Sequence, residues 1–158
     1  MLLDPSEEAL SDRAEALLMA ADRAQHVAEL VRPTLNAGRH VVSDRYSYSS
    51  IAYQGYGRGL PVDEVRELSE WATNGCTPDL VLLLTVPADI AASRLGDSLD
   101  RFEKVGGEFH ERVQAGYEEM AANDPARWRV VPAVGDIAEI QQAILDVVLP
   151  AIGAGDLP

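Results

Sequence analysis

The segment from Asp44 to Gly59 constrains this chain most, because charged, hydroxyl and glycine residues directly follow a short apolar run at 40–43. Open parallel sheets bind ligands beyond the carboxyl ends of their strands. The Arg45 side chain offers a planar fork that matches two phosphate oxygens, and the Asp44 carboxylate can hold Mg²⁺ directly or through water. The sequence therefore predicts a loop at a strand end that forms a phosphate-ester site.

The region before this segment has the pattern of one long amphipathic helix. From about 11 to 35, apolar residues recur every three or four positions, as they do on one face of an α-helix. We expect Ser11 to cap the N-terminus, Pro33 to kink the last turn, and residues 36–38 to end the helix.

Apolar runs and helical patterns alternate along the rest of the chain. We expect strands at 40–43, 80–84 and 128–131, and helices at 62–74, 88–95, 107–123 and 137–149. Continuously apolar strands between helices are typical of a parallel α/β sheet. We predict one domain over 1–152 and a frayed tail over 153–158. The glycine-flanked, charge-rich segment 96–107 is either a mobile cover over a site or an ordinary surface loop.

Composition excludes several classes of protein. With 158 residues and 47% hydrophobic content, the chain can build a core, so a soluble globular protein is expected. No run of about 18 apolar residues occurs, so we predict no membrane span and a cytoplasmic protein. A net charge of −13 argues against a nucleic-acid groove or an anionic membrane partner. Cys76 is the only cysteine and reads as a small half-buried thiol, and the histidines lack zinc-site spacing.

Three runs together resemble the bacterial thymidylate kinases, which pass the γ-phosphoryl of ATP to dTMP. They are ADRAQHV at 21–27, DRYSYSSIAYQGYGRG at 44–59, and DRFE at 100–103. The resemblance extends from Leu2 to Ala133. It implies a P-loop NTPase-type three-layer parallel sheet with flanking helices, the use of Mg²⁺ and ATP, and a homodimer when the protein is full length.

The family's first motif, G-x-x-x-x-G-K-[ST], does not occur in these 158 residues. The only lysine, Lys104, lies between Glu103 and Val105, away from any such turn. Residues 1–5 resemble a segment that the family carries inside its N-terminal third. We therefore expect an N-terminally truncated fragment that is inactive on its own. The resemblance further implies that it lacks the family's first strand, which lies between the strands at 40–43 and 80–84.

The resemblance implies a role for several residues of the segment that follows Asp44. It places Asp44 near Mg²⁺ and Arg45 on the dTMP phosphate, both as catalytic groups. Tyr53 would lie against the deoxyribose and leave no room for a 2′-hydroxyl, while Ser50 and Gln54 would line the same pocket. The three glycines at 55, 57 and 59 either permit turns or contact the ligand, and Arg58 faces either a phosphate or solvent.

Met19 and Arg23 lie four residues apart and share one face of the predicted helix. By resemblance, Arg23 reads the thymine carbonyl, and Met19 replaces the aromatic ring that usually stacks on the base. A thioether can pack on a ring face, although less directionally. On helical pattern alone, Met19 would be a core residue and Arg23 a solvated charge.

The resemblance makes 96–107 the lid, which brings an arginine over the transferring phosphoryl. Arg94 and Arg101 are the candidates for this catalytic role, and Arg94 would also contact ATP. Asp100 and Glu103 would order the lid, because phosphoryl transfer depends on positioning more than on proton abstraction. The backbone at Ala133 would lie near the adenine.

Two alternatives stay open. A catalytically dead nucleotide-binding or interaction module would keep the acceptor site without the chemistry. A different deoxynucleoside or nucleotide kinase would share the fold, but it would not predict AYQG at 52–55 beside ADR at 21–23.

Overall fold

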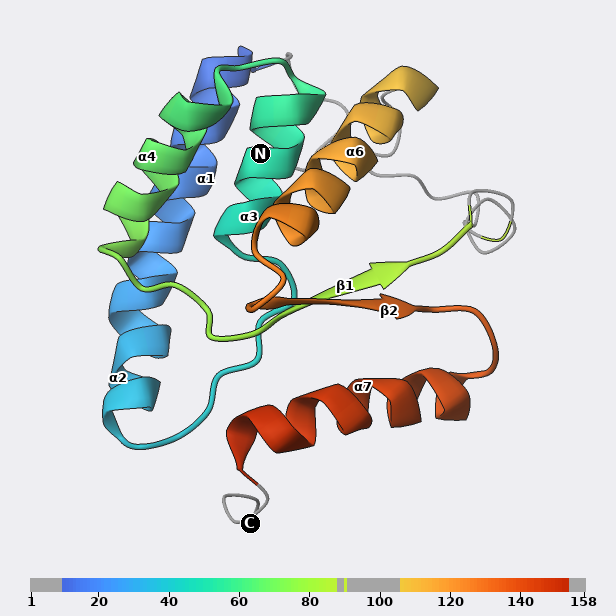
Figure 1. Cartoon of the computed structure of the whole chain (residues 1–158). Helices are drawn as coiled ribbons and strands as arrows, with labels where there is room; N and C mark the ends of the chain where they lie inside the picture. The colour runs from blue at the N-terminus through green and yellow to red at the C-terminus, as the bar shows by residue number, and fades with distance from the viewer. Residues whose placement is uncertain (1–9, 88–89, 91–105, 154–158) are drawn as a thin grey trace. The chain divides into compact units, whose positions relative to one another are not determined.

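The computed structural model describes residues 10–87, 90 and 106–153, and they fall into two compact units (Figure 1). Unit 1 comprises Met1–Thr77 with Leu99–Glu118, and unit 2 comprises Pro78–Ser98 with Glu119–Pro158. Each unit is described by itself below. The expectation of one domain over 1–152 stays a prediction.

Unit 1 begins with the predicted long helix, which is confirmed as three consecutive helical stretches. They are α1 (Asp12–His26), the π-helix η1 (Val27–Val31) and α2 (Arg32–Asn36). Ser11 caps the start as expected, since its side chain accepts a hydrogen bond from the Ala14 amide at 3.3 Å. The π-helix ends two residues before Pro33. Pro33 lacks an N–H and would clash with the carbonyl four residues earlier in a regular α-helix.

The segment after Tyr46 is helical, so the expectation of a loop was wrong there. It forms α3 (Ser47–Ser50) and the π-helix η2 (Ile51–Gly57). Close packing against α6 (Gly107–Asn123) explains the glycine at 57. A Cβ added at Gly57 would lie 2.6 Å from Cε2 of Phe109. Of the three glycines at 55, 57 and 59, only Gly59, at φ +76°, has the left-handed conformation of a turn.

The helix α4 (Val62–Thr73) confirms the prediction for 62–74 and lies beside α1 (Figure 1). It ends at Asn74 in the left-handed conformation, where the Arg32 guanidinium donates to the Asn74 carbonyl. Apolar side chains from α1, η1, η2, α4 and α6 form the buried core of this unit. They are Ala16, Ala20, Val27, Val31, Ile51, Ala52, Val65, Ala72, Phe109 and Val113.

Unit 2 contains the parallel strands β1 (Val81–Thr85) and β2 (Trp128–Pro132), paired in register from Val81 with Trp128 to Thr85 with Pro132. The predicted strands at 80–84 and 128–131 and the parallel α/β class are thereby confirmed. The helix α7 (Ile137–Ile152) follows, as predicted for 137–149. A capping box starts it, in which Asp136 and Glu139 each bond the other's backbone amide.

The strand predicted at 40–43 is absent. These residues have no regular structure, and the Val42 side chain is 96% exposed. A strand needs a hydrogen-bonded neighbour, and the sheet in the described part of the chain pairs only β1 with β2. The helix expected over 88–95, apart from Ile90, and residues 96–105 of the predicted lid lie outside the described residues.

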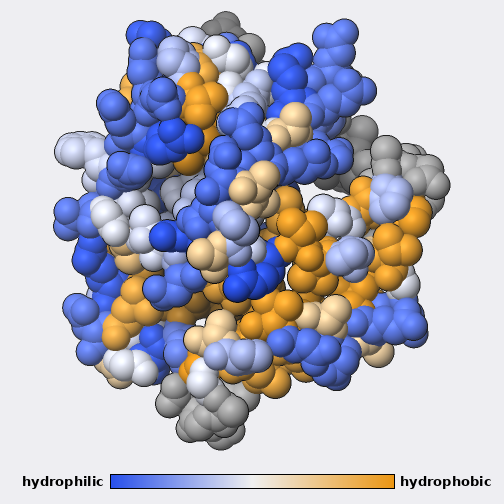
Figure 2. Space-filling model, in the orientation of Figure 1, coloured by the Kyte–Doolittle hydropathy of each residue, from blue (hydrophilic) through white to orange (hydrophobic). Residues whose placement is uncertain are grey.

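Unit 2 leaves apolar surface uncovered. Leu84 and Val130 are 47% and 55% exposed, and no residue of α7 is fully buried. Figure 2 shows apolar residues gathered over β1, β2 and α7. An α/β sheet normally has both faces covered by helices, whereas among the described residues β1 and β2 have only each other as hydrogen-bonded neighbours. None of the described helices is both long and apolar enough to span a bilayer.

Candidate functional site

Arg45 lies where the irregular segment after 40–43 meets α3, in an unusual backbone conformation. Its φ is 71°, a left-handed value that non-glycine residues rarely adopt. The Ser43 hydroxyl donates to the Arg45 carbonyl at 2.8 Å and supports this bend. Backbone strain of this kind is common at ligand sites and persists only where the surroundings hold it.

Two tyrosines hold the Arg45 side chain. Its Nη1 donates to the Tyr117 hydroxyl at 3.0 Å, and its Cζ lies 5.4 Å from the centre of the Tyr53 ring. Burial pulls the pKa of Arg45 down, but the phenols of Tyr117 and Tyr53 outweigh it and the pKa lies above its usual value. The structure thus brings together Arg45 and Tyr53, as predicted, with Asp44 exposed beside them.

Arg23 and Met19 lie half-buried on α1. The Arg23 guanidinium lies 5.2 Å from the centre of the Tyr46 ring, and the Tyr46 hydroxyl donates to the Cys76 carbonyl at 2.8 Å. Burial lowers the pKa of Arg23 and raises that of Tyr46 to about 12. Arg23 Nε is buried without a hydrogen-bond partner in the described part of the chain. A buried donor of this kind is costly unless a ligand or water accepts its hydrogen bond.

The fully buried carboxylate of Glu15, on α1, accepts hydrogen bonds from Gln54 in η2 and from Arg58, which follows η2. Gln54 Nε2 donates to it at 3.0 Å, and Arg58 donates from Nε and Nη2 at 3.2 and 3.1 Å. The Arg58 guanidinium also lies 5.0 Å from the centre of the Phe109 ring. Gln54 and Arg58 therefore order the segment that carries Tyr53. The alternative of a solvent-facing Arg58 was wrong, because its side chain bonds Glu15, and a phosphate contact by Arg58 stays a prediction.

Edge-on contacts between aromatic rings link η2 with α6. The Tyr53 ring meets Phe109 edge-on at 5.9 Å and Tyr117 edge-on at 6.5 Å. Ser50 is buried at the end of α3, and the neighbouring Ser49 hydroxyl lies 2.8 Å from the Tyr117 hydroxyl. These contacts draw α1, α3, η2 and α6 of unit 1 into one polar, aromatic-lined site.

Sequence reasoning missed four residues of this site: Glu15, Tyr46, Ser49 and Tyr117. Glu15 could have been found, because it lies four residues before Met19 on the helix face already singled out. Tyr46 belongs to a quoted motif but received no role. No local pattern identifies Tyr117, which comes 72 residues after Arg45.

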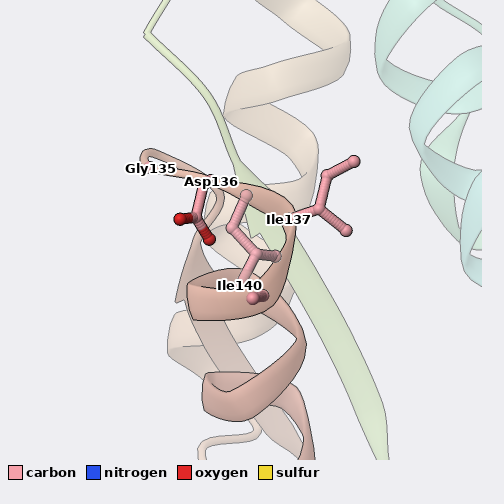
Figure 3. Close-up of a pocket in the computed structure, with 5 residues that line it drawn as sticks. Gly135, Asp136, Ile137 and Ile140 are labelled. Atoms are coloured by element: carbon pink, nitrogen blue, oxygen red, sulfur yellow. The ribbon is translucent and has the colours of Figure 1, made fainter.

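A second candidate region lies in unit 2, at the carboxyl ends of β1 and β2. The hollow there, of about 710 Å³, is lined by Gly135, Asp136, Ile137, Ala138 and Ile140 (Figure 3). The capping box already occupies amides of this helix start. Nearby Ala133 is buried, and its amide donates to the Thr85 carbonyl at 2.8 Å.

Several predicted residues are not described. Arg94, Asp100, Arg101 and Glu103 lie outside the described residues. Within the described ranges, no three His, Cys, Asp or Glu side chains group as a metal site. Cys76 is free and half-buried, as expected.

Comparison with known proteins identifies the family of this chain. A family model described as Thymidylate kinase matches residues 1–144. A thymidylate kinase of Chromobacterium violaceum is 46% identical over 147 residues, which cover 92% of this chain and 69% of that protein. One of Leifsonia xyli is 51% identical over 138 residues, covering 85% and 65%.

A third relative shows the same partial coverage. The thymidylate kinase of Solidesulfovibrio magneticus is 44% identical over 157 residues, which cover 94% of this chain and 75% of that protein. The chain thus spans about two thirds to three quarters of the length of these relatives. On the family model and on these identities, the chain belongs to the thymidylate kinase family.

Proposed function

We propose that this chain carries the dTMP-binding part of a thymidylate kinase, the enzyme that converts ATP and dTMP to ADP and dTDP. The observation that carries the proposal is the Arg45 guanidinium, held by Tyr53 and by the Tyr117 hydroxyl in a strained bend. A cation fixed in this way on an otherwise acidic protein suits a phosphate monoester. We assign dTMP as the nucleotide because the relatives are named thymidylate kinases.

Each proposed substrate contact has a structural basis. Arg45 would bind the acceptor phosphate, and Tyr53 would lie against the deoxyribose. The unpartnered Nε of Arg23 would donate toward the base, and the half-buried Met19 would pack on the ring. Ser50 and Gln54 would line the pocket on its buried side, where Gln54 is bonded to Glu15.

Asp44 suits the Mg²⁺ role. Magnesium is usually held by one or two carboxylates together with substrate phosphates and water, so one exposed carboxylate beside Arg45 is a fitting donor. When bound, Mg²⁺ neutralises charge on the phosphates during transfer. Arg94 or Arg101 would approach the same phosphates, and the backbone at Ala133 would lie near the adenine of ATP. We also propose a cytoplasmic homodimer for the full-length protein, without nucleic-acid or membrane partners.

The 158 residues contain no G-x-x-x-x-G-K-[ST] motif, which cradles the triphosphate in this class of kinase. This observation favours a second candidate for the chain by itself, a module that binds dTMP without transferring phosphate. We therefore propose that the isolated chain binds dTMP and does not turn it over.

Calorimetric titration and a coupled assay of ADP release test both parts. The chain should bind dTMP more tightly than ribothymidine monophosphate, because Tyr53 would crowd a 2′-hydroxyl. ADP release in the presence of ATP, Mg²⁺ and dTMP should equal the rate without protein. Equal affinity for the two nucleotides would contradict the role of Tyr53. An absence of dTMP binding would overturn the proposed site.

A further inference from the structure

The hydroxyl of Tyr117 contacts two residues of the Asp44–Gly59 segment, although Tyr117 lies far away on α6. It accepts a hydrogen bond from Arg45 Nη1 at 3.0 Å and shares one with Ser49 Oγ at 2.8 Å. Tyr117 was not given a direct substrate contact above. Its hydroxyl nevertheless links Arg45 to α6 through a hydrogen bond.

Arg45 requires such a tie for geometric reasons. A guanidinium binds a phosphate well only when its fork presents two N–H groups in the right plane. The Tyr53 ring centre lies 5.4 Å from the guanidinium, and the Tyr53 phenol also contributes a side-chain hydrogen bond to Arg45. The hydrogen bond to Tyr117, at 3.0 Å, adds a second directional contact that limits rotation of the fork.

Tyr117 is itself well placed to act as a fixed support. A Cβ added at the adjacent Gly116 would lie 2.6 Å from the Tyr56 ring, so the bare glycine lets α6 approach η2 closely. The edge of Tyr53 packs against the Tyr117 ring. Burial raises the pKa of Tyr117, so its hydroxyl is protonated at neutral pH.

We propose that Tyr117 is a positioning residue that orients the Arg45 guanidinium toward the phosphate of a nucleoside monophosphate. The inference rests on the proposed function, in which Arg45 binds that phosphate. Tyr117 then acts only through Arg45. Its hydroxyl matters for a ligand that carries the phosphate and not for the corresponding nucleoside.

The test compares dTMP with thymidine on the 158-residue chain, by calorimetry for dTMP and by NMR titration for the weaker nucleoside. Tyr117→Phe should weaken dTMP binding roughly tenfold, as expected for one hydrogen bond to a charged group. Thymidine affinity should stay within about twofold of the wild type. Tyr48→Phe is the matched control, because it removes a hydroxyl from the same segment at a residue given no role in the site. It should leave both affinities unchanged.

A double-mutant cycle separates positioning from a merely structural role. In an Arg45→Ala background, Tyr117→Phe should cause no further loss of dTMP affinity. A full additional tenfold loss there, or an equal loss for thymidine, would overturn the inference. If circular dichroism shows that Tyr117→Phe is unfolded, Ser49→Ala decides instead, with roughly threefold weaker dTMP binding expected and unchanged binding contradicting the proposal. A wild-type chain that binds no dTMP would instead refute the proposed function itself.

Discussion

Glu15→Ala should strongly destabilise unit 1, because it removes the acceptor shared by Gln54 and Arg58. The Glu15 carboxylate is fully buried, whereas the Arg58 side chain is 17% exposed. Deleting one member of a buried ion pair costs about 3–5 kcal/mol, since the remaining charge stays desolvated. Arg58 can reach water and lies 3.6 Å from Asp12, which lowers this figure. The Gln54 amide, only 2% exposed, loses its acceptor and adds to it. We expect a net loss of about 3–4 kcal/mol.

Urea unfolding followed by far-UV circular dichroism measures this loss. Glu64→Ala is the matched control, because its partner Arg13 lies 3.7 Å away and both side chains are largely exposed, so less than about 1 kcal/mol should be lost. Glu15→Gln should fall between the two, since it keeps acceptor and donor atoms without the charge. If Glu15→Ala and Glu64→Ala unfold at the same urea midpoint, the contacts of Glu15 with Gln54 and Arg58 do not hold η2 in place.

Three further outcomes follow from particular contacts. Gly116→Ala should lower the free energy of unfolding by about 1–2 kcal/mol, because the added Cβ would collide with the Tyr56 ring. Gly107→Ala adds its Cβ in open space and should be neutral or slightly stabilising in the same urea titration. Folding raises the pKa of Tyr46 from 10.0 to about 12, so stability present below pH 10 should decline as the pH rises toward 12, and Tyr46→Phe should flatten that decline in pH-dependent unfolding. Met19→Phe should tighten dTMP binding by about 0.5–1.5 kcal/mol in calorimetry, and weaker binding would show that Met19 does not face the base.

The sequence was most informative where one local signal sufficed. Helical spacing and the Ser11 cap predicted α1 through α2, and continuous apolar runs predicted β1 and β2. These features depend on neighbours within a few residues or on simple burial. Local pattern also brought Met19 and Arg23 onto one face of α1.

Features that depend on distant partners could not be predicted in this way. The run at 40–43 has strand composition but lacks a paired neighbour among the described residues. Glycines at 55 and 57 suggested a loop, whereas helix packing against Phe109 requires the small residue at 57. Tyr117 reaches Arg45 only because α6 folds back on the segment after Asp44.

The central claim is that Arg45 binds the phosphate of dTMP, and calorimetric titration of three variants tests it most directly. Arg45→Ala should weaken dTMP binding by at least roughly thirtyfold, because a charge-assisted contact to a dianion is lost. Arg66→Ala removes an equal charge from an exposed pair with Asp63 and should leave dTMP affinity unchanged. Wild-type, Arg45→Ala and Arg66→Ala chains that bind dTMP with the same dissociation constant would contradict the account.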